Sequence, residues 1–247
     1  MTKKTDPGHS RTDLEGFESP THYCPGCSHG IVERIMLEAF QSLGMKDHCA
    51  VILGAGCAIH ADGHLKLDLV QAAPGMAPAV ATGLKRTLPD RLVICYQGDA
   101  DLYGRGLSPV LQAASRGETF TLLCLNNRAA GYAEGRVSPS TPIGMKLRGA
   151  ATGRTPERHG YPLDLLEIIQ GISGVVLAER VVMDSPKKVK KASSVLKKAL
   201  ESQKENRGLS YIELVGVCPT GWGLSPVDAV HQLAEEGKTP SEIPEKP

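Results

Sequence analysis

The sequence predicts an α/β fold with a mostly parallel β-sheet and helices on both faces. Short apolar runs, each about the length of a buried strand, alternate along the chain with segments whose apolar residues recur at helical spacing. Such alternation is typical of strand–helix–strand units, which form parallel sheets covered on both sides. With 247 residues and no internal repeat, the chain is long enough for one large domain of this class.

The elements follow from local patterns. A helix is expected over 29–44, where apolar residues have helical spacing and Gly44 is a natural stop. Ser185 is the expected N-cap of a long basic helix over 185–206. The loop 128–160 is rich in Gly and Pro, and loops of that length in a compact domain are usually functional or mobile. The other expected elements are a strand within 48–59, a helix over 77–88, a strand over 91–99, a helix over 107–117, a strand over 120–127, a helix over 162–173, strands over 174–182 and 209–218, and a helix over 225–237.

The composition excludes several classes of protein. A formal net charge of +1 and an aromatic content of 4% are unlike those of nucleic-acid-binding proteins. The longest apolar stretches are too short and too interrupted by glycine to span a membrane, and the N-terminus lacks the apolar core of a signal peptide. We therefore expect a cytoplasmic protein without nucleic-acid or membrane partners. We expect a flexible arm at 1–19, one domain at 20–235 and a disordered tail at 236–247.

Polar residues close two successive strands. Gly98, Asp99 and Ala100 stand at the end of one, and Asn126 and Asn127 close the next. A right-handed crossover can place both strand ends at one edge of the sheet, where ligands bind. There the Asp and Asn oxygens could hold Mg²⁺ with diphosphate oxygens, and Gly98 would let the backbone approach a phosphate. The dipeptides are also common in ordinary turns, so they do not decide the matter alone.

Seven cysteines are spread along the chain, unlike the dense and even set of a secreted disulfide framework. Cys24 and Cys27 flank a Pro-Gly turn and need further ligands to hold a metal. Cys57 and His60 would complete a zinc site, whereas Cys57 and Cys218 would complete the four thiolates that a [4Fe–4S] cluster prefers. The spacing leaves both sets open.

The other cysteines are Cys49, Cys95 and Cys124. The last two lie inside apolar strands, so we expect them in the core. His60 and His64 are expected to be loop residues rather than metal ligands, with a role for His60 near a bound cofactor left open.

Eight segments resemble, in this order, the thiamine-diphosphate-binding β subunit of 2-oxoacid:ferredoxin oxidoreductases of the 2-oxoglutarate or branched-chain 2-oxoacid type. They are HYCPGCSHGI, GAGC, APAVATGLKR, GDAD, LNN, SPSTPIG, GYPLDL and CPTGWGLSPVDA. The pair GDAD and LNN corresponds to the thiamine-diphosphate motif, usually GDG followed by NN. The resemblance extends from about residue 20 to residue 230 and implies the thiamine-diphosphate-binding fold.

The resemblance implies two sets of ligands. The ligands of a [4Fe–4S] cluster would be Cys24, Cys27, Cys57 and Cys218. The ligands of Mg²⁺ would be Asp99, Asn127 and the carbonyl oxygen of Ala129. Thiamine diphosphate itself would contact the motif at Gly98, Asp99 and Ala100 and the backbone at Gly56 and Ala58.

The resemblance also implies an activity: coenzyme A-dependent oxidative decarboxylation of a 2-oxoacid, with electrons passed to ferredoxin. The thiazolium ring would delocalise the charge left when CO₂ departs, and a nearby cluster would take the electrons one at a time. No catalytic acid or base is assigned to this chain, because the aminopyrimidine half of the cofactor is expected on a partner α subunit. The chain alone would be inactive, and γ and δ subunits are further candidate members of the hetero-oligomer.

Departures from the family gather near the expected cofactor, at Pro74, Met76, Ala100, Ala130 and Glu134. An alanine at the third motif position costs little if its φ is negative. Together the departures permit a diverged paralogue that keeps the cluster but not thiamine chemistry. A zinc-binding structural protein is the alternative from a different class.

Charged residues give predictions about the substrate and the partners. Glu134 would repel a distal carboxylate and so disfavour 2-oxoglutarate, although Arg128 or Arg136 could instead attract that carboxylate. The lysines of the helix at 187–204 could dock an acidic ferredoxin, but a solvated face is the favoured interpretation.

Overall fold

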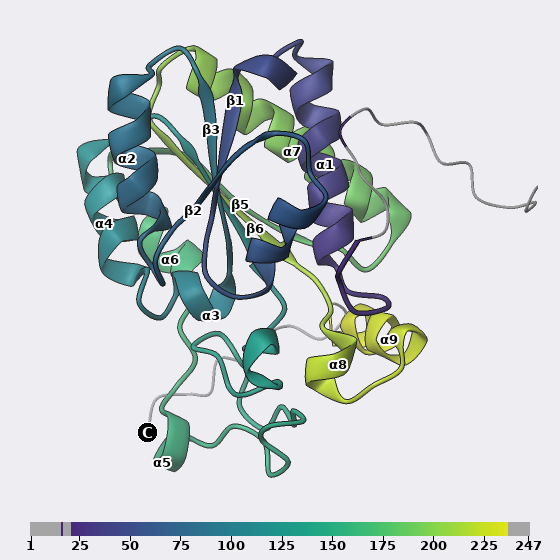
Figure 1. Ribbon diagram of the computed structural model, residues 1–247. Helices are drawn as coiled ribbons and strands as arrows, with labels where there is room; N and C mark the ends of the chain where they lie inside the picture. The colour runs from purple at the N-terminus through teal and green to yellow at the C-terminus, as the bar shows by residue number, and fades with distance from the viewer. Residues whose placement is uncertain (1–15, 17–20, 237–247) are drawn as a thin grey trace, which may run out of the picture.

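The computed structural model describes Gly16 and residues 21–236. Within that part, six parallel strands form one sheet in the order β2-β1-β3-β4-β6-β5 (Figure 1). The strands are β1 Cys49–Leu53, β2 Asp68–Gln71, β3 Leu92–Gly98, β4 Thr121–Asn126, β5 Val175–Val182 and β6 Leu209–Val215. The predicted α/β class is therefore confirmed. The expected arm at 1–19 and tail at 236–247 lie, apart from Gly16 and Glu236, outside the described residues.

Helices cover both faces of the sheet. On one face, α1 His29–Ser42 packs beside α7 Pro186–Lys204, and on the other lie α2 Ala77–Thr87, α4 Leu107–Arg116 and α6 Leu165–Ile169 (Figure 1). The shorter helices are α3 Asp99–Leu102, α5 Pro156–His159 and α8 Pro219–Trp222, with α9 Pro226–Glu236 near the end and 3₁₀ turns η1 Lys46–His48, η2 Cys57–Gly63 and η3 Gly131–Ala133. In the part of the chain that the structure describes, no helix combines the length and apolar character that a membrane span requires.

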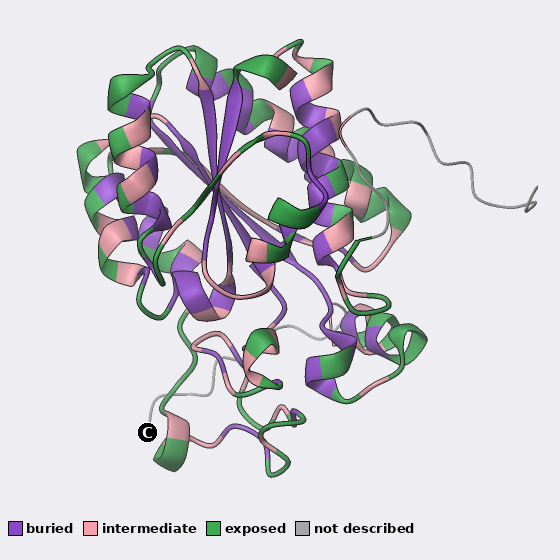
Figure 2. Cartoon of the chain, viewed as in Figure 1, coloured by how far each residue is buried: buried purple, intermediate pink, exposed green. Residues whose placement is uncertain are grey.

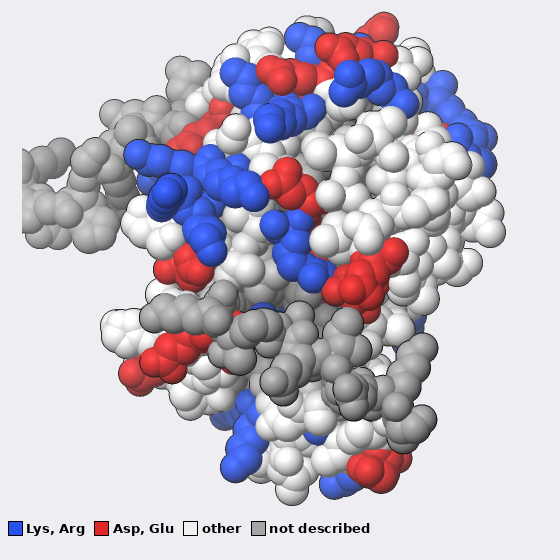
Figure 3. All heavy atoms as spheres, turned by 180° about the vertical axis from the view of Figure 1, so that it is seen from behind, with Lys and Arg blue, Asp and Glu red and all other residues white. Residues whose placement is uncertain are grey.

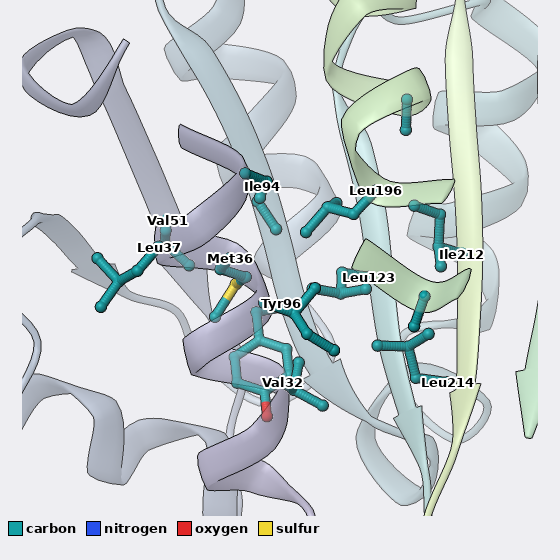
Figure 4. Packing of buried hydrophobic residues seen from close by; sticks show 14 of the residues in the cluster. Val32, Met36, Leu37, Val51, Ile94, Tyr96, Leu123, Leu196, Ile212 and Leu214 are labelled. Carbon is teal, nitrogen blue, oxygen red and sulfur yellow. The ribbon is translucent and has the colours of Figure 1, made fainter. Parts of the chain in front are cut away.

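The core follows from the alternation of side chains along central strands. On β3, Ile94 and Tyr96 face α1 and α7, whereas Val93 and Cys95 face α2 and α4. Figure 4 shows Val32 and Met36 of α1 packed toward the first pair, and Figure 2 shows the central strands buried along their length. Cys95 is 1% exposed, and Cys124 on β4 is fully buried, which confirms their predicted place in the core.

Two expectations are corrected. Strand β2 was not predicted, because it is an edge strand whose residues are mostly exposed and lack a strong apolar pattern. The helix expected over 162–173 is only the short α6, because Asp164 caps it by accepting the N–H of Glu167 at 3.1 Å and the helix ends before Gly171.

The long basic helix forms as expected, with Ser185 at its N-cap, although that side chain makes no capping hydrogen bond. Its apolar residues pack into the core, and two of its lysines pair with acids: Lys188 with Asp184 at 3.2 Å and Lys191 with Glu179 at 2.7 Å. Seen from behind, basic and acidic side chains are interspersed on the surface (Figure 3).

A smaller layer lies beyond the carboxyl ends of the strands. It consists of the loop 128–160 together with α8 and α9 (Figure 1), and a small apolar cluster around Trp222 and Leu233 holds it together. Ligand sites of open α/β sheets are found at this edge.

Candidate cofactor and metal site

The two polar strand ends lie side by side. Gly98 pairs with Leu125 in the β3–β4 ladder, so Asp99 and the Asn126–Asn127 pair leave the sheet next to each other. Asp99 is 1% exposed, and burial raises its pKa to about 6, although hydroxyl hydrogen bonds oppose the rise. The crossover expected from the sequence thus brings these side chains together.

The side-chain amide of Asn127 lies beside two other groups of the expected Mg²⁺ set. With its NH₂ turned toward them, it donates to Asp99 Oδ1 at 3.3 Å and to the carbonyl oxygen of Ala129 at 2.8 Å. Both groups therefore lie within hydrogen-bonding distance of the Asn127 amide. With the amide turned over, its oxygen would join those of Asp99 and Ala129, and hard oxygen ligands of this kind are those that Mg²⁺ binds.

Two serines that the sequence analysis did not single out hold Asp99 in place. Ser138 and Ser140 both donate to Asp99 Oδ2, the second at 2.6 Å, and Ser140 also donates to Asn126 Oδ1 at 3.0 Å. They come from SPSTPIG in the long loop, one of the eight segments that resemble the family, and that resemblance could have pointed to them. The loop thus supplies polar contacts to the strand ends.

Arg154 fixes that loop. It is 3% exposed and donates to six backbone carbonyls of the loop and the residues just after it, those of Ser138, Pro139, Thr141, His159, Gly160 and Tyr161. The predicted loop 128–160 contains the short elements η3 and α5, and buried hydrogen bonds from Arg154 connect its segments.

A buried ion network supports Asn126 from within the sheet. The fully buried Glu213 accepts from Asn126 Nδ2 at 2.6 Å and from Arg180 Nε at 2.7 Å. Arg180 also pairs with both carboxylate oxygens of Asp164, at 2.9 and 2.7 Å. This network fixes the Asn126 amide so that its oxygen faces Ser140.

The four predicted cluster cysteines come from three separate segments, and those of Cys57 and Cys218 meet near Gly131. A Cβ on Gly131 would lie 3.1 Å from Cys218 Sγ and 3.6 Å from Cys57 Sγ. Burial, and then the neighbouring thiols, raise the pKa of Cys27 to about 12 and that of Cys57 to about 11.

Neither predicted ligand set surrounds a single point in the described residues. Among the described residues, no three His, Cys, Asp or Glu side chains lie close enough to hold one metal ion, and this applies to the zinc set and to the four thiolates alike. A zinc ion needs its ligands around a single point, whereas a [4Fe–4S] cluster spreads four thiolates over four irons. His64 is buried and pairs with Glu33 at 2.5 Å, and His60 is exposed. Both ligand sets therefore stay predictions.

One cavity connects the two groups of residues. Cys57 lines it together with Asp99, Asn127 and Ala129, and its remaining lining residues are His29, Ala55, Gly98, Ala100, Asp101, Gly131 and Tyr132. Gly56 and Ala58 are not among them: the Tyr132 ring covers Gly56, where a Cβ would lie 2.8 Å from it, and Ala58 is fully buried. The predicted thiamine contacts at those two residues stay predictions.

Comparison with known proteins decides the family. The family model of the thiamine pyrophosphate enzyme, C-terminal TPP binding domain, matches residues 49–214. The 2-oxoglutarate synthase subunit KorB of Methanocaldococcus jannaschii is 31% identical over 223 residues, which is 87% of this chain and 78% of the relative. The chain belongs to the thiamine-pyrophosphate-binding subunits of 2-oxoacid oxidoreductases.

Other matches agree with this assignment. The ketoisovalerate oxidoreductase subunit VorA of Methanothermobacter thermautotrophicus is 37% identical over 238 residues, and the match covers 96% of this subunit but 50% of the relative. The oxidoreductase subunit thus spans about half the length of that relative. In structure it resembles 2-oxoglutarate:ferredoxin oxidoreductase from Magnetococcus marinus, with a TM-score of 0.74, 24% identity and coverage of 93% of this chain and 75% of the other, which supports the fold.

Within this oxidoreductase subunit, the departures from the family sit in ordered surroundings. Ala100 lies in the α3 turn, and the described non-glycine residues with positive φ are Arg128, Glu134 and Asn206, so Ala100 is not strained. The Gly75 N–H donates to Asp101 Oδ1 at 2.7 Å, which anchors the segment between Pro74 and Met76.

Glu134, from which a substrate preference was predicted, is exposed and does not line the cavity of the oxidoreductase subunit. Arg128 pairs with Glu236 of α9 instead of facing the cavity. Neither side chain, in this structure, is placed to contact a molecule in that cavity.

Proposed function

We propose that the chain is the β subunit of a 2-oxoacid:ferredoxin oxidoreductase that binds thiamine diphosphate through Mg²⁺ and carries one [4Fe–4S] cluster. The whole enzyme would oxidatively decarboxylate a 2-oxoacid with coenzyme A and pass electrons to ferredoxin. The observation that carries the proposal is the single cavity lined both by Cys57 and by Asp99, Asn127 and Ala129. A cavity shared in this way supports the proposal that the two cofactors lie close together.

Mg²⁺ would be held by Asp99, Asn127 and the Ala129 carbonyl. Ser138 and Ser140 keep the Asp99 carboxylate oriented. Because Asp99 is 1% exposed, little water competes for its oxygens. Thiamine diphosphate, when bound, supplies an electron sink for the carbanion that decarboxylation leaves. The residues of this chain bind and orient that cofactor.

Cys24, Cys27, Cys57 and Cys218 would hold the cluster. Two of these thiols, those of Cys57 and Cys218, lie within 3.6 Å of a Cβ built on Gly131, which supports a shared site for them. Four thiolates are the ligand set that a [4Fe–4S] cluster prefers.

The substrate class we propose is a branched-chain 2-oxoacid such as 2-ketoisovalerate. Of the two kinds of relative, the ketoisovalerate subunit has the higher identity and covers 96% of the chain. The described cavity lining includes Asp99 and Asp101 but neither Lys nor Arg, so it offers no cationic partner for a second, distal carboxylate. An α subunit is the proposed partner that would complete the site.

The test is a cofactor count on the native complex, purified without oxygen. We expect about one thiamine diphosphate and about four irons with four sulfides per copy of this chain. Iron and sulfide without thiamine diphosphate would refute thiamine chemistry and favour the diverged paralogue. Zinc in place of iron would refute the cluster and favour the structural zinc protein.

A further inference from the structure

His29 joins the cysteine group to the cavity. It begins α1 two residues after Cys27, with Ser28 as the N-cap between them. Its side chain is 2% exposed and lines the cavity that also contains Asp99 and Asn127. Neither the resemblance nor the expected ligand sets gave this residue a role.

Two tyrosines hold the imidazole ring. Its Nδ1 is hydrogen-bonded to the hydroxyl of Tyr96, whose ring is fully buried on β3. The Tyr23 ring stacks on it with centroids 4.9 Å apart and planes inclined by 10°. Tyr23 is itself anchored through a hydrogen bond to the buried Glu33. A side chain fixed in this way is positioned before any ligand arrives.

The hydrogen bond with Tyr96 also sets the position of the ring proton. Among the described residues, His29 Nδ1 is the acceptor found for the Tyr96 hydroxyl, and a buried hydroxyl without an acceptor would be costly. The tyrosine therefore donates to Nδ1, and the ring carries its proton on Nε2. With Nδ1 engaged and one ring face covered, Nε2–H is the polar group that His29 offers to the cavity.

The ligand of such a donor is an anionic oxygen. The oxygens of Asp99, Asn127 and Ala129 in the same cavity are acceptors and suit a cation. The N–H of His29 comes from a different element, and because it is a donor it suits an anion. We propose that His29 Nε2–H donates a hydrogen bond to an anionic oxygen of the molecule bound in this cavity, which is either the diphosphate of the cofactor or the carboxylate and 2-oxo group of the substrate. The proposal rests on the proposed function and adds a binding residue to it.

The experiment uses the native complex purified without oxygen, with His29→Phe, His29→Gln and Tyr96→Phe variants. Phenylalanine keeps an aromatic ring against Tyr23 but removes the donor, and glutamine keeps a donor without the ring. His48→Phe is the matched control, because His48 is exposed in η1, before the amino end of β1. The readouts are the Kd of thiamine diphosphate in saturating Mg²⁺, measured by calorimetry after cofactor removal, the iron content, and kcat and KM for 2-ketoisovalerate.

We expect His29→Phe to retain iron and to lose about 10- to 100-fold in one binding parameter, the size of a hydrogen bond to a charged group. A weaker Kd for thiamine diphosphate assigns the diphosphate, and an unchanged Kd with reduced kcat/KM assigns the substrate. His29→Gln should recover part of the loss, and Tyr96→Phe should lose less than His29→Phe in the same parameter.

Kd and kcat/KM within about twofold of wild type in His29→Phe would overturn the proposal. So would loss of iron in both His29 variants, because the residue would then act only on the cysteine turn. A wild-type complex that binds neither thiamine diphosphate nor the 2-oxoacid would refute the proposed function, and this proposal with it.

Discussion

Glu213 should be one of the most stability-critical polar residues of the fold. It is fully buried on β6, and each of its carboxylate oxygens accepts one short hydrogen bond, from Asn126 and from Arg180. In Glu213→Gln, an amide NH₂ must replace one of the two oxygens and face a donor. The variant therefore loses a charge-assisted hydrogen bond and leaves Arg180 with Asp164 as its remaining carboxylate.

The magnitude follows from burial. Removing one partner of a buried ion pair costs about 3–5 kcal/mol, and because the Arg180 side chain is 33% exposed and keeps Asp164, the lower end of about 3 kcal/mol applies. For a chain of 247 residues this corresponds to a fall in Tm of about 6–12 °C. Asp164→Asn removes the outer contact of the same network, where both side chains are about one-third exposed, and should cost less than about 1 kcal/mol.

The assay is urea unfolding of the purified chain, monitored by far-UV circular dichroism, for wild type and both variants. The free energy of unfolding and its slope against urea concentration are compared among the three. Equal slopes would mean that the variants change stability rather than the extent of unfolding. The reasoning is refuted if Glu213→Gln costs less than about 1 kcal/mol, or if Asp164→Asn costs as much as Glu213→Gln. Either result would mean that burial does not govern the strength of this network.

Three further predictions follow from the same structure. Cys218→Ala should abolish the iron content of the anaerobically purified complex, while Cys124→Ala, a core substitution, should retain it; equal iron in both would remove Cys218 from the ligand set. Arg154→Lys leaves several loop carbonyls without donors, so the loop 128–160 should be cleaved faster in limited proteolysis, with a cost of about 3 kcal/mol, and unchanged cleavage would contradict its role. Although burial opposes ionisation, the hydrogen bonds from Arg180 lower the pKa of Asp164, so its stabilisation is present above the ordinary carboxyl pKa and is lost as the pH falls through the lowered value. As the pH falls through that range, the free energy of unfolding should therefore decrease less in Asp164→Asn than in wild type. Identical pH profiles of the free energy of unfolding would exclude the contribution.

Much of the fold could be predicted because local patterns are strong where strands are buried on both faces. The runs that became β3 and β4 are apolar almost throughout, and their lengths match buried strands. Strand β2 escaped prediction because an exposed edge strand needs no such pattern; its pairing with β1 places it in the sheet. Helix α6 was overestimated because the apolar pattern continues beyond the point where the chain turns away at Gly171.

The residues of the candidate site likewise include some that the sequence predicted and some that it did not. The sequence pointed to Asp99 and Asn127, because the end of a buried strand is recognisable from the residues around it. It gave no role to Ser138, although that residue lies in the segment SPSTPIG, nor to Glu213 or Arg154. Their contacts depend on crossovers between strands and on the packing of the loop.

By itself, the sequence determined the α/β class, the order of most elements, the resemblance to 2-oxoacid oxidoreductase subunits and the position of the polar strand ends. It left open whether Cys57 and Cys24 act with His60 or with Cys218. The tertiary structure brings Cys218 and Cys57 together beside Gly131, because β6 lies beside β4 and therefore carries Cys218 to the edge of the sheet where the loop after Asn127 begins. The spacing of residues along the chain determines which of them share one face of a helix or strand. Contacts between distant segments depend instead on strand order, which local sequence does not encode.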